Sequence, residues 1–551
     1  MFRLFRRRRQ GASRGRGQPE GEGGQESRHA QRPTDEGITF GNMPDKEPID
    51  PDLNKVKARL DDYLGDSPDI GRRDFKIAGK TDALAVFVDG LVDKALLNSG
   101  LLRPLILGVV EAGIHPPIND LHELVRTSLT AHGIETTGDM VQAVNSVPDG
   151  TVVIFIQGSR QAILATMRMW ATRSIEKPEE RPSVRGPKEA FTETLRLNTS
   201  LVRRRVRTPL LRVEDMKLGT VGRAELCFMY VKGLAADGLV QEVRRRLNRM
   251  DTDISISVQG VEECLEDHPL SLVPTAFTTE RPDEVAAGLA DGRVAIMLDG
   301  TPEALIVPTQ LSQYIQAPDD YYTRWPAGTV IRWFRMFAML LALAAPAVYV
   351  ALITYHQEMI PQRLLMTLAQ EREVVPLPAL LELLLMEATF EILREAGLRL
   401  PRPFGQAVSI VGGLVIGDAA VLAGLVSPGM VITVALTAVA SFAVPELSMH
   451  LAIRIARFAL TILGGFLGFF GVLTGLLFML VHVSALRSFG VPFLAGLAPV
   501  SKRGLKDLLW RAPAWATKLR PEHLSPGHRQ KKTSSTRPDP YRHDEGGDEL
   551  R

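Results

Sequence analysis

The order of hydrophobic and polar positions divides the chain into two parts. Up to about Trp333, short apolar runs alternate with charged stretches, as in a folded domain of strands and helices. Between Trp333 and Arg487, long apolar runs follow one another, and basic residues return after Arg487. The pattern predicts an α/β cytoplasmic region followed by an all-α, polytopic transmembrane bundle.

The second part contains four apolar runs that are predicted to cross a membrane as helices. A helix of about 20 apolar residues, at ~1.5 Å per residue, covers the ~30 Å hydrocarbon layer. Basic residues at both flanks predict that the N-terminal region and the tail are cytoplasmic, which requires an even number of crossings. We assign a transmembrane region at 330–485, a basic cytoplasmic tail at 486–551, and spans at 334–355, 407–426, 430–444 and 458–483.

A further helical pattern at 379–397 leaves the number of crossings open. It is apolar on average but carries Glu382, Glu387 and Glu391. As a fifth crossing it would place the tail outside, unless the last run is a hairpin or the stretch 491–497 re-enters the membrane. As an amphipathic interfacial helix it would leave the count at four.

Two carboxylates on this helix are candidates for an ion path. Glu387 and Glu391 are one helical turn apart and share a face, whereas Glu382 points roughly the other way. Charged groups at membrane depth are costly and usually face a bundle interior, a partner or water. These two could attract cations to a pore. Alternatively, Glu391 could pair with Arg394, or with basic groups on another chain, at the membrane surface.

Small residues recur at helical spacing in two of the predicted spans. Both sets follow the spacing i, i+4, i+7, i+11, which puts each set on one helix face. In lipid, such faces let helix backbones approach closely. We therefore predict helix packing, within or between subunits, at Gly413, Gly417, Ala420, Gly424, Gly464, Gly468, Gly471 and Gly475.

The soluble part contains an internal duplication. The run at 86–91 matches the run at 229–234, and the run at 152–162 matches that at 294–304, both at an offset of about 142 residues. This predicts two related α/β subdomains at 70–180 and 220–312, joined by a linker at 181–219. Arg203, Arg204 and Arg205 in the linker are interpreted as a solvated or subunit-facing basic surface.

Composition restricts the classes of function. Of 551 residues, 45% are hydrophobic and 23% charged, and the formal net charge of +2 gives no reason to expect a nucleic-acid partner. With two cysteines, the chain is not predicted to have a disulfide framework. Residues 1–50 have the composition of a disordered basic arm. We find no catalytic constellation, metal site or nucleotide loop, and predict neither an enzyme nor a cofactor.

From about Phe75 to Trp515 the chain resembles the A subunits of bacterial spore germinant receptors, the GerA family. The resemblance rests on several long stretches that occur in the same order. They include Val88-Asp-Gly-Leu-Val-Asp-Lys94, Val184-Arg-Gly-Pro-Lys-Glu-Ala-Phe-Thr-Glu-Thr-Leu-Arg196, Phe390-Glu-Ile-Leu-Arg-Glu-Ala-Gly397 and Leu486-Arg-Ser-Phe-Gly-Val-Pro492.

The resemblance implies a multi-pass protein of the spore inner membrane. Such A subunits are thought to work with B-type subunits and lipoprotein C-type subunits, and to form a homo-oligomer that conducts monovalent cations when nutrients bind. Two alternatives remain open at this point. One is an accessory germination channel subunit that senses no nutrient, and the other is a non-conducting membrane scaffold or a transporter.

Overall fold

The structure is a computed structural model that describes most of the chain. The described residues are 44–108, 133–168, 178, 185–399, 417–498, 508–513, 515–516, 520–521 and 524. Residues 44–50 belong to the stretch assigned from composition to a disordered arm, but they contact the first sheet region. Ile49 is buried, and its N–H donates to the carbonyl oxygen of Gly138 at 3.1 Å.

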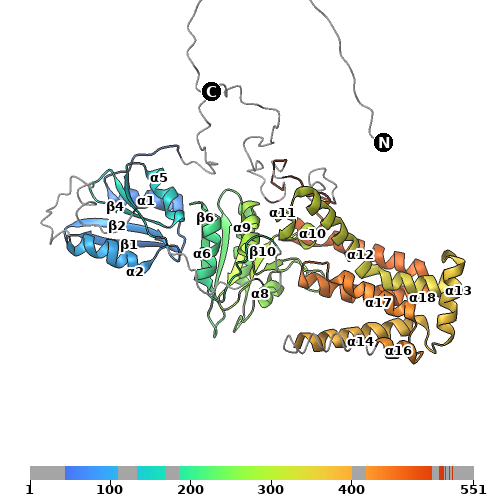
Figure 1. Ribbon diagram of the computed structural model, residues 1–551. Helices are drawn as coiled ribbons and strands as arrows, with labels where there is room; N and C mark the ends of the chain where they lie inside the picture. Colours follow the sequence, from blue (N-terminus) through green and yellow to red (C-terminus); the bar gives the residue numbers. More distant parts are fainter. Residues whose placement is uncertain are drawn as a thin grey trace, which may run out of the picture. The chain divides into compact units, whose positions relative to one another are not determined.

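The first sheet has five antiparallel strands in the order β1-β2-β4-β5-β3. Helices α1 and α5 cover one face, and α2 with the π-helical turns η1 and η2 covers the other (Figure 1). Asp52 caps α1 by accepting a hydrogen bond from the Asn54 N–H at 3.0 Å. The elements are α1 (Leu53–Leu64), β1 (Ile70–Ile77), β2 (Thr81–Val88), α2 (Lys94–Leu97), η1 (Asn98–Leu102), η2 (Pro104–Gly108), β3 (Ile134–Thr137), α5 (Met140–Ser146), β4 (Thr151–Ile156) and β5 (Ala162–Thr166).

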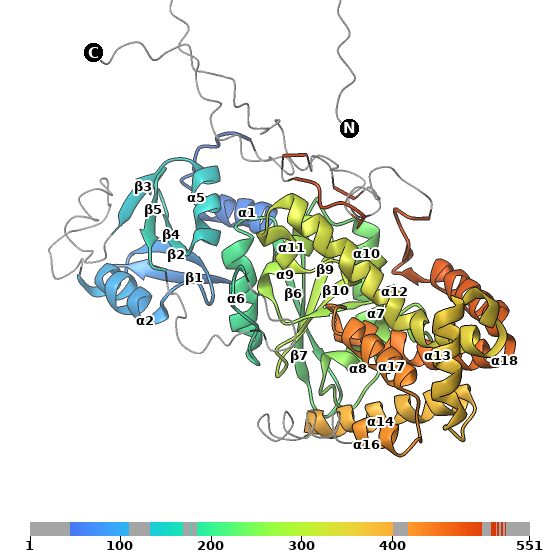
Figure 2. The ribbon, with the colours of Figure 1, turned by 45° about the vertical axis from the view of Figure 1, so that its right-hand side comes forward.

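The second sheet repeats this strand order as β6-β7-β9-β10-β8. Helices α6 and α9 cover one face, and α7 and α8 cover the other (Figure 2). The duplicated runs fall on equivalent strands, because β2 and β7 hold one pair and β4 and β9 the other. The prediction of two related subdomains is therefore confirmed. The elements are α6 (Leu195–Arg205), β6 (Leu211–Leu218), β7 (Ala224–Val231), α7 (Asp237–Arg249), α8 (Val258–Leu265), β8 (Phe277–Thr279), α9 (Pro282–Ala290), β9 (Val294–Leu298) and β10 (Ala304–Val307).

The segment predicted as a linker forms part of the second subdomain and holds the two sheets together. It contains α6 and β6, and Arg203 on α6 is fully buried. Its guanidinium forms an ion pair with the buried carboxylate of Asp69, which lies just before β1. The interpretation of Arg203 as part of a solvated or subunit-facing surface was wrong, since Arg203 is buried within the chain and a carboxylate distant in sequence compensates its charge.

The remaining described helices form the apolar part of the protein. Only α12 and α18, among the described helices, are long and apolar enough to cross a membrane, and α17 is a shorter apolar helix. The predicted spans 334–355 and 458–483 lie in α12 and α18, and part of 407–426 lies outside the described residues. The elements are α10 (Leu311–Ile315), α11 (Pro318–Tyr322), α12 (Trp325–Tyr355), η4 (Gln357–Met359), α13 (Gln362–Glu373), α14 (Ala379–Arg399), α16 (Gly417–Leu422), α17 (Pro428–Ser441), α18 (Leu447–Ala485), β11 (Arg487–Ser488) and β12 (Val491–Pro492).

Helix α18 is broken at Gly468 and folds back on itself. Gly468 has φ of 61° and ψ of −145°, a conformation essentially restricted to glycine. A Cβ added at Gly475 would lie 2.6 Å from Leu460 Cδ1. In a continuous helix these two positions would be about 22 Å apart. The last apolar run is thus a hairpin, which is one of the arrangements that the crossing count left open.

Both ends of the α18 hairpin lie against the second subdomain. Met449 and Ala452 at its start are buried in the core that includes α6, α9 and one face of the second sheet, and Val483 packs on the same core. The turn lies beside the far end of α12, where Tyr355 Oη donates to the carbonyl oxygen of Phe466 at 2.9 Å. The hairpin therefore runs the length of the helical part and returns.

Helix α14 also runs along this length. Leu380, at its start, lies within 2.6 Å of a Cβ added at Gly465, near the hairpin turn. Glu391, three turns later, reaches Arg454 near the start of α18. The stretch 491–497 does not return into the helical part, because Phe493 is buried in the core of the second subdomain and its carbonyl accepts from the Leu311 N–H at 2.9 Å.

Candidate functional site

A cluster of charged side chains lies between α14 and the first arm of α18. On α14, Glu387, Glu391 and Arg394 follow the spacing i, i+4, i+7 and so share one face. The helix begins directly after Pro378, whose fixed φ and missing N–H favour a position before or at a helix start. Its leucines and glutamates have high helix propensity.

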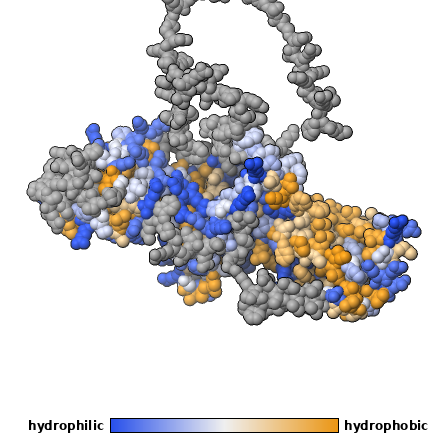
Figure 3. Space-filling view, in the orientation of Figure 1, coloured by the Kyte–Doolittle hydropathy of each residue, from blue (hydrophilic) through white to orange (hydrophobic). Residues whose placement is uncertain are grey.

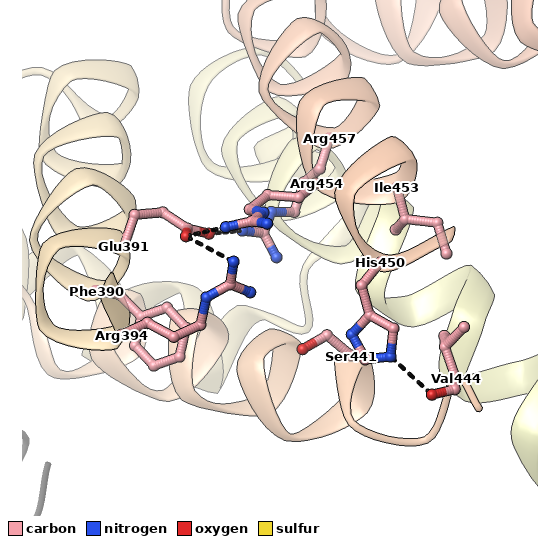
Figure 4. A pocket seen from close by; sticks show the side chains of 9 residues that line it. All are labelled: Phe390, Glu391, Arg394, Ser441, Val444, His450, Ile453, Arg454 and Arg457. Atoms are coloured by element: carbon pink, nitrogen blue, oxygen red, sulfur yellow. Dashed lines mark hydrogen bonds and ion pairs between the residues drawn. The ribbon is translucent and has the colours of Figure 1, made fainter. Parts of the chain in front are cut away.

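The facing arm of α18 carries basic groups at the same spacing, namely His450, Arg454 and Arg457. Figure 4 shows the side chains of Arg454 and Arg457 directed toward Glu391 of α14. Arg454 Nη1 donates to Glu391 Oε2 at 2.6 Å, and Arg457 Nη2 lies 3.6 Å from Glu391 Oε1. Matched spacing on two adjacent helices allows several pairs to form at once.

Glu387 is the most deeply placed member. It is 1% exposed, and its Oε1 lies 3.1 Å from Nε of Arg457, which is 5% exposed. This is an ion pair without hydrogen-bond alignment, because neither Glu387 oxygen accepts a hydrogen bond from any described residue. A buried carboxylate held by charge alone depends strongly on its partner cation.

Positive charge exceeds negative charge in this cluster. Two carboxylates, Glu387 and Glu391, face three guanidinium groups, because Arg394 Nη2 also lies 3.4 Å from Glu391 Oε2. His450 donates instead to the carbonyl oxygen of Val444 at 2.7 Å. In this conformation the cluster does not present a negative field that would attract a cation.

The space inside the cluster is small. A cavity of about 10 Å³ lies among Phe390, Glu391, His450 and Arg454, and it has room for about one water molecule. The structure therefore brings the two predicted carboxylates together, but it pairs them with arginines, and this cavity between them is too small for a hydrated cation.

Glu382 occupies a different place, as the helical spacing predicts. It is fully buried, and its Oε1 accepts from the N–H and the hydroxyl of Ser427, each at 2.6 Å. Ser427 is the residue before α17, so the carboxylate stabilises the N-terminus of that helix. Glu382 thus connects α14 to α17.

The predicted small-residue positions are distributed between helix ends and the hairpin. Gly413 lies outside the described residues. Gly417 and Ala420 are on the short α16, and Gly424 follows that helix with φ of 65°.

The second set, Gly464, Gly468, Gly471 and Gly475, lies on the α18 hairpin. A Cβ at Gly464 would lie 2.9 Å from the Ala347 carbonyl oxygen on α12, and one at Gly471 would lie 2.1 Å from the Leu463 carbonyl oxygen. At these glycines the backbones of the two arms of α18 approach each other closely, and the backbone of α18 approaches that of α12.

Sequence reasoning missed Arg454 and Arg457 because it placed the start of the last span at Phe458. The signal was present in the spacing of His450, Arg454 and Arg457, which repeats the spacing of the charged groups on α14. No group of three or more His, Cys, Asp or Glu side chains in the described part of the chain is placed to hold a metal ion.

The comparison with known families decides the assignment of the chain. The family described as Bacillus/Clostridium GerA spore germination protein matches residues 58–523. This protein belongs to the GerA family of spore germination proteins. The resemblance found in the sequence is therefore confirmed.

Relatives within the family match most of the chain. Spore germination protein KA of Bacillus subtilis (strain 168) is 41% identical over 495 residues, covering 89% of this chain and 90% of that protein. Spore germination protein GerLA of Bacillus cereus is 36% identical, covering 89% of this chain and 98% of that protein. The crystal structure of the N-terminal domain of the A subunit of the Bacillus megaterium spore germinant receptor GerK3 is 30% identical. It covers 48% of this chain and 97% of that domain, with a TM-score of 0.38.

Proposed function

We propose that this protein is the A-type subunit of a nutrient germinant receptor in the spore inner membrane, and that copies of it form a nutrient-gated path for monovalent cations. B-type subunits and lipoprotein C-type subunits would be its partners. The proposal assigns it no enzymatic reaction. Family membership supports the role in germination, and the charge cluster supports the cation path.

The single observation that carries the cation path is the pairing of Glu387 and Glu391 with arginines inside an apolar helical part. The surface of that part is predominantly hydrophobic on the face shown in Figure 3. Buried charges in such surroundings are costly, and they are retained where they serve a path or a switch. The arginines neutralise the carboxylates in this conformation, so we assign it to the closed state. Opening would separate α14 from the first arm of α18 and expose the carboxylates to water.

The same arrangement suits a multi-pass protein with both flanks on one side of the membrane. Helix α12 starts next to the second subdomain, where Arg335 pairs with Asp320 at 3.0 Å, and the α18 hairpin ends next to it. An even number of membrane crossings would place the start of α12 and the end of the α18 hairpin on the same side of the membrane. The basic residues that flank these two ends favour the cytoplasmic side.

The test is potassium flux from liposomes that contain the purified protein, alone and with its partner subunits. We expect the double variant Glu387→Gln and Glu391→Gln to have altered flux, because the amides keep the shape of the carboxylates and remove their charge. Glu395→Gln on the exposed side of α14 is the matched control and should conduct as the unchanged protein does. We expect Arg457→Gln to raise basal flux, because it releases Glu387 from its ion pair.

Unchanged flux in a folded double variant would refute the assignment of these carboxylates to the path. A folded oligomer that conducts no cation even with its partners would favour a non-conducting scaffold. Conduction without any response to nutrients in the complete receptor would favour the accessory role.

A further inference from the structure

The loop between α8 and β8, residues 266–276, directs two leucines outward. Leu270 is 99% exposed and Leu272 is 54% exposed. One exposed leucine is ordinary on a protein surface. Two of them on the tip of one loop need an explanation from the conformation of the loop and from its surroundings.

Hydrogen bonds and an ion pair fix the two stems of this loop. Asp267 forms an ion pair with Arg246 on α7 and accepts from the Gly490 N–H at 3.2 Å. At the other stem, Tyr314 Oη donates to the Pro274 carbonyl oxygen at 3.0 Å. The tip is therefore set in its conformation before it meets a partner, so inserting it costs little conformational entropy.

The tip itself is attached to the end of α18. Ser271, which lies between the two leucines, places its Oγ 3.1 Å from His482 Nε2. The same hydroxyl accepts from the Val273 N–H at 3.1 Å. His482 is in the last turn of α18, whose hairpin is strongly apolar.

Apolar surface continues from α18 to this point. Phe478, Leu480 and Val481 on the preceding turn of α18 are 73%, 58% and 60% exposed. Ser271, the residue between the two leucines, contacts His482 one turn beyond these side chains. The loop thus extends the apolar surface of the hairpin onto the second subdomain.

Aromatic residues near the start of α12 are also typical of a membrane surface. Trp333 on α12 and Trp510 form an edge-to-face pair, with ring centroids 6.2 Å apart, and both are about half exposed, as is typical of aromatic residues at a membrane surface. Met339 is about 9 Å further along α12 than Trp333. Met339, Val483 and Val273 all pack on the same core cluster. Val273, in the stem of the loop, thus packs on the same core as residues of α12 and α18.

We propose that the loop at 268–272 inserts Leu270 and Leu272 into the lipid bilayer, at the boundary between headgroups and acyl chains, and so anchors the second subdomain to the membrane. The proposal rests on the proposed membrane-spanning role of α18. Lipid is favoured over a protein partner because two leucines present a small wedge that continues a membrane-facing helix. A specific protein interface buries about 800 Å² on each partner.

The experiment measures how close single positions come to lipid in liposomes that contain the full-length protein. Cys264 is exposed and is replaced by serine, and Cys227 is buried and remains. An environment-sensitive fluorophore is attached at Leu270→Cys or Leu272→Cys, and phospholipids with a nitroxide near the headgroup serve as quenchers. We expect each label to lose emission to this quencher, because interfacial apolar groups lie ~5–10 Å into the boundary between headgroups and acyl chains.

Two control positions make the result interpretable. Phe478→Cys on the exposed face of α18 should be quenched most by a nitroxide placed deeper in the acyl chain. Val221→Cys should not be quenched, although Val221 is 73% exposed. Val221 lies in the β6–β7 turn near the Leu226–Leu298 end of the second sheet, whereas β8 begins opposite Ile306, toward the other end.

Quenching at Leu270 no greater than at Val221, with Phe478 quenched, would overturn the anchor while the membrane role of α18 stands. A blue shift at Leu270 without quenching would also overturn it, because that result means a protein contact. No quenching at Phe478 in folded protein would overturn the membrane role of α18 and the anchor with it.

Discussion

The buried ion pair between Asp69 and Arg203 gives the sharpest prediction about how the two sheet subdomains are held together. Both side chains are at most 1% exposed. Arg203 Nη2 donates to Asp69 Oδ1 at 2.8 Å, and Nε donates to the other carboxylate oxygen. Two neighbouring hydrogen bonds cross the same interface, from Arg212 to the Tyr63 carbonyl oxygen at 2.9 Å and from the Val213 N–H to Ser67 Oγ at 3.3 Å.

Removing one partner should cost more than removing both. Asp69→Leu leaves the guanidinium of Arg203 buried without its counter-charge. Arg203→Met likewise leaves the carboxylate of Asp69 buried without its counter-charge. Each should cost about 3–5 kcal/mol of interface stability, which raises the opening equilibrium roughly 100- to 5,000-fold. The double variant buries neither charge and should lie within about 2 kcal/mol of the unchanged protein.

Hydrogen exchange of the full-length protein in detergent provides the measurement. Backbone amides of β1 and α6 should exchange faster in each single variant, and protection should return in the double variant. Asp82→Asn is the control, because its pair with Lys76 at 3.6 Å is about 60% exposed on both sides and should contribute less than about 1 kcal/mol. If the double variant opens as readily as either single variant, the reasoning from charge burial is wrong.

Two further predictions concern the α18 hairpin and a buried acid. Cysteines at Leu460 and Gly475, in a chain with Cys227 and Cys264 replaced, should form a disulfide, and Gly468→Ala should lower its yield. Alanine there costs about 1–3 kcal/mol of backbone strain. Its Cβ would also meet His356 Cε1 at 2.8 Å. No described residue lies within 4 Å of a Cβ at Gly417, so Gly417→Ala is the control. Equal yields would contradict the assigned backbone conformation. Burial, with a smaller effect of Glu266, raises the pKa of Glu262 on α8 from 4.5 to about 8. The folded state holds this proton more tightly than the unfolded state does. The contribution of Glu262 to the free energy of unfolding should therefore be fully present below about pH 4.5 and be lost as the pH rises toward 8. The melting temperature of Glu262→Gln should decline less steeply with rising pH than that of Glu263→Gln, a variant of the exposed neighbouring residue. Parallel curves of melting temperature against pH would refute the raised pKa of Glu262.

The repeat in the soluble part could be predicted from the sequence because strand pairing leaves a regular pattern. Buried strands such as β4 and β9 are continuous apolar runs, each followed by a turn at Gly158 or Gly300. The antiparallel order of the strands was not predictable from these runs alone. It depends on β3 and β8, which are short and lack a distinct pattern.

The partners of the two carboxylates were harder to predict because they are separated by about 60 positions in sequence. Helical spacing correctly placed Glu387 and Glu391 on one face and Glu382 on another. It gave no information on which helix faces them. That is decided by the fold of α18, where a single residue, Gly468, reverses a run that hydropathy interprets as one long helix.

The contacts described above form a continuous route from the first sheet to the charge cluster. Asp69 ties the first sheet to α6, and α6 packs on the core that also contains Met449 and Ala452 of α18. Arg454 lies half a turn after Ala452 and holds Glu391. Spatial continuity alone does not establish coupling, since coupling requires that a change at one end alter an equilibrium at the other. The Arg203→Met variant supplies that test without touching the cluster. If it alters potassium flux while Asp82→Asn does not, the first sheet acts on the proposed cation path through α6 and α18. If flux is unchanged although hydrogen exchange shows the interface open, the two sheets act independently of the path.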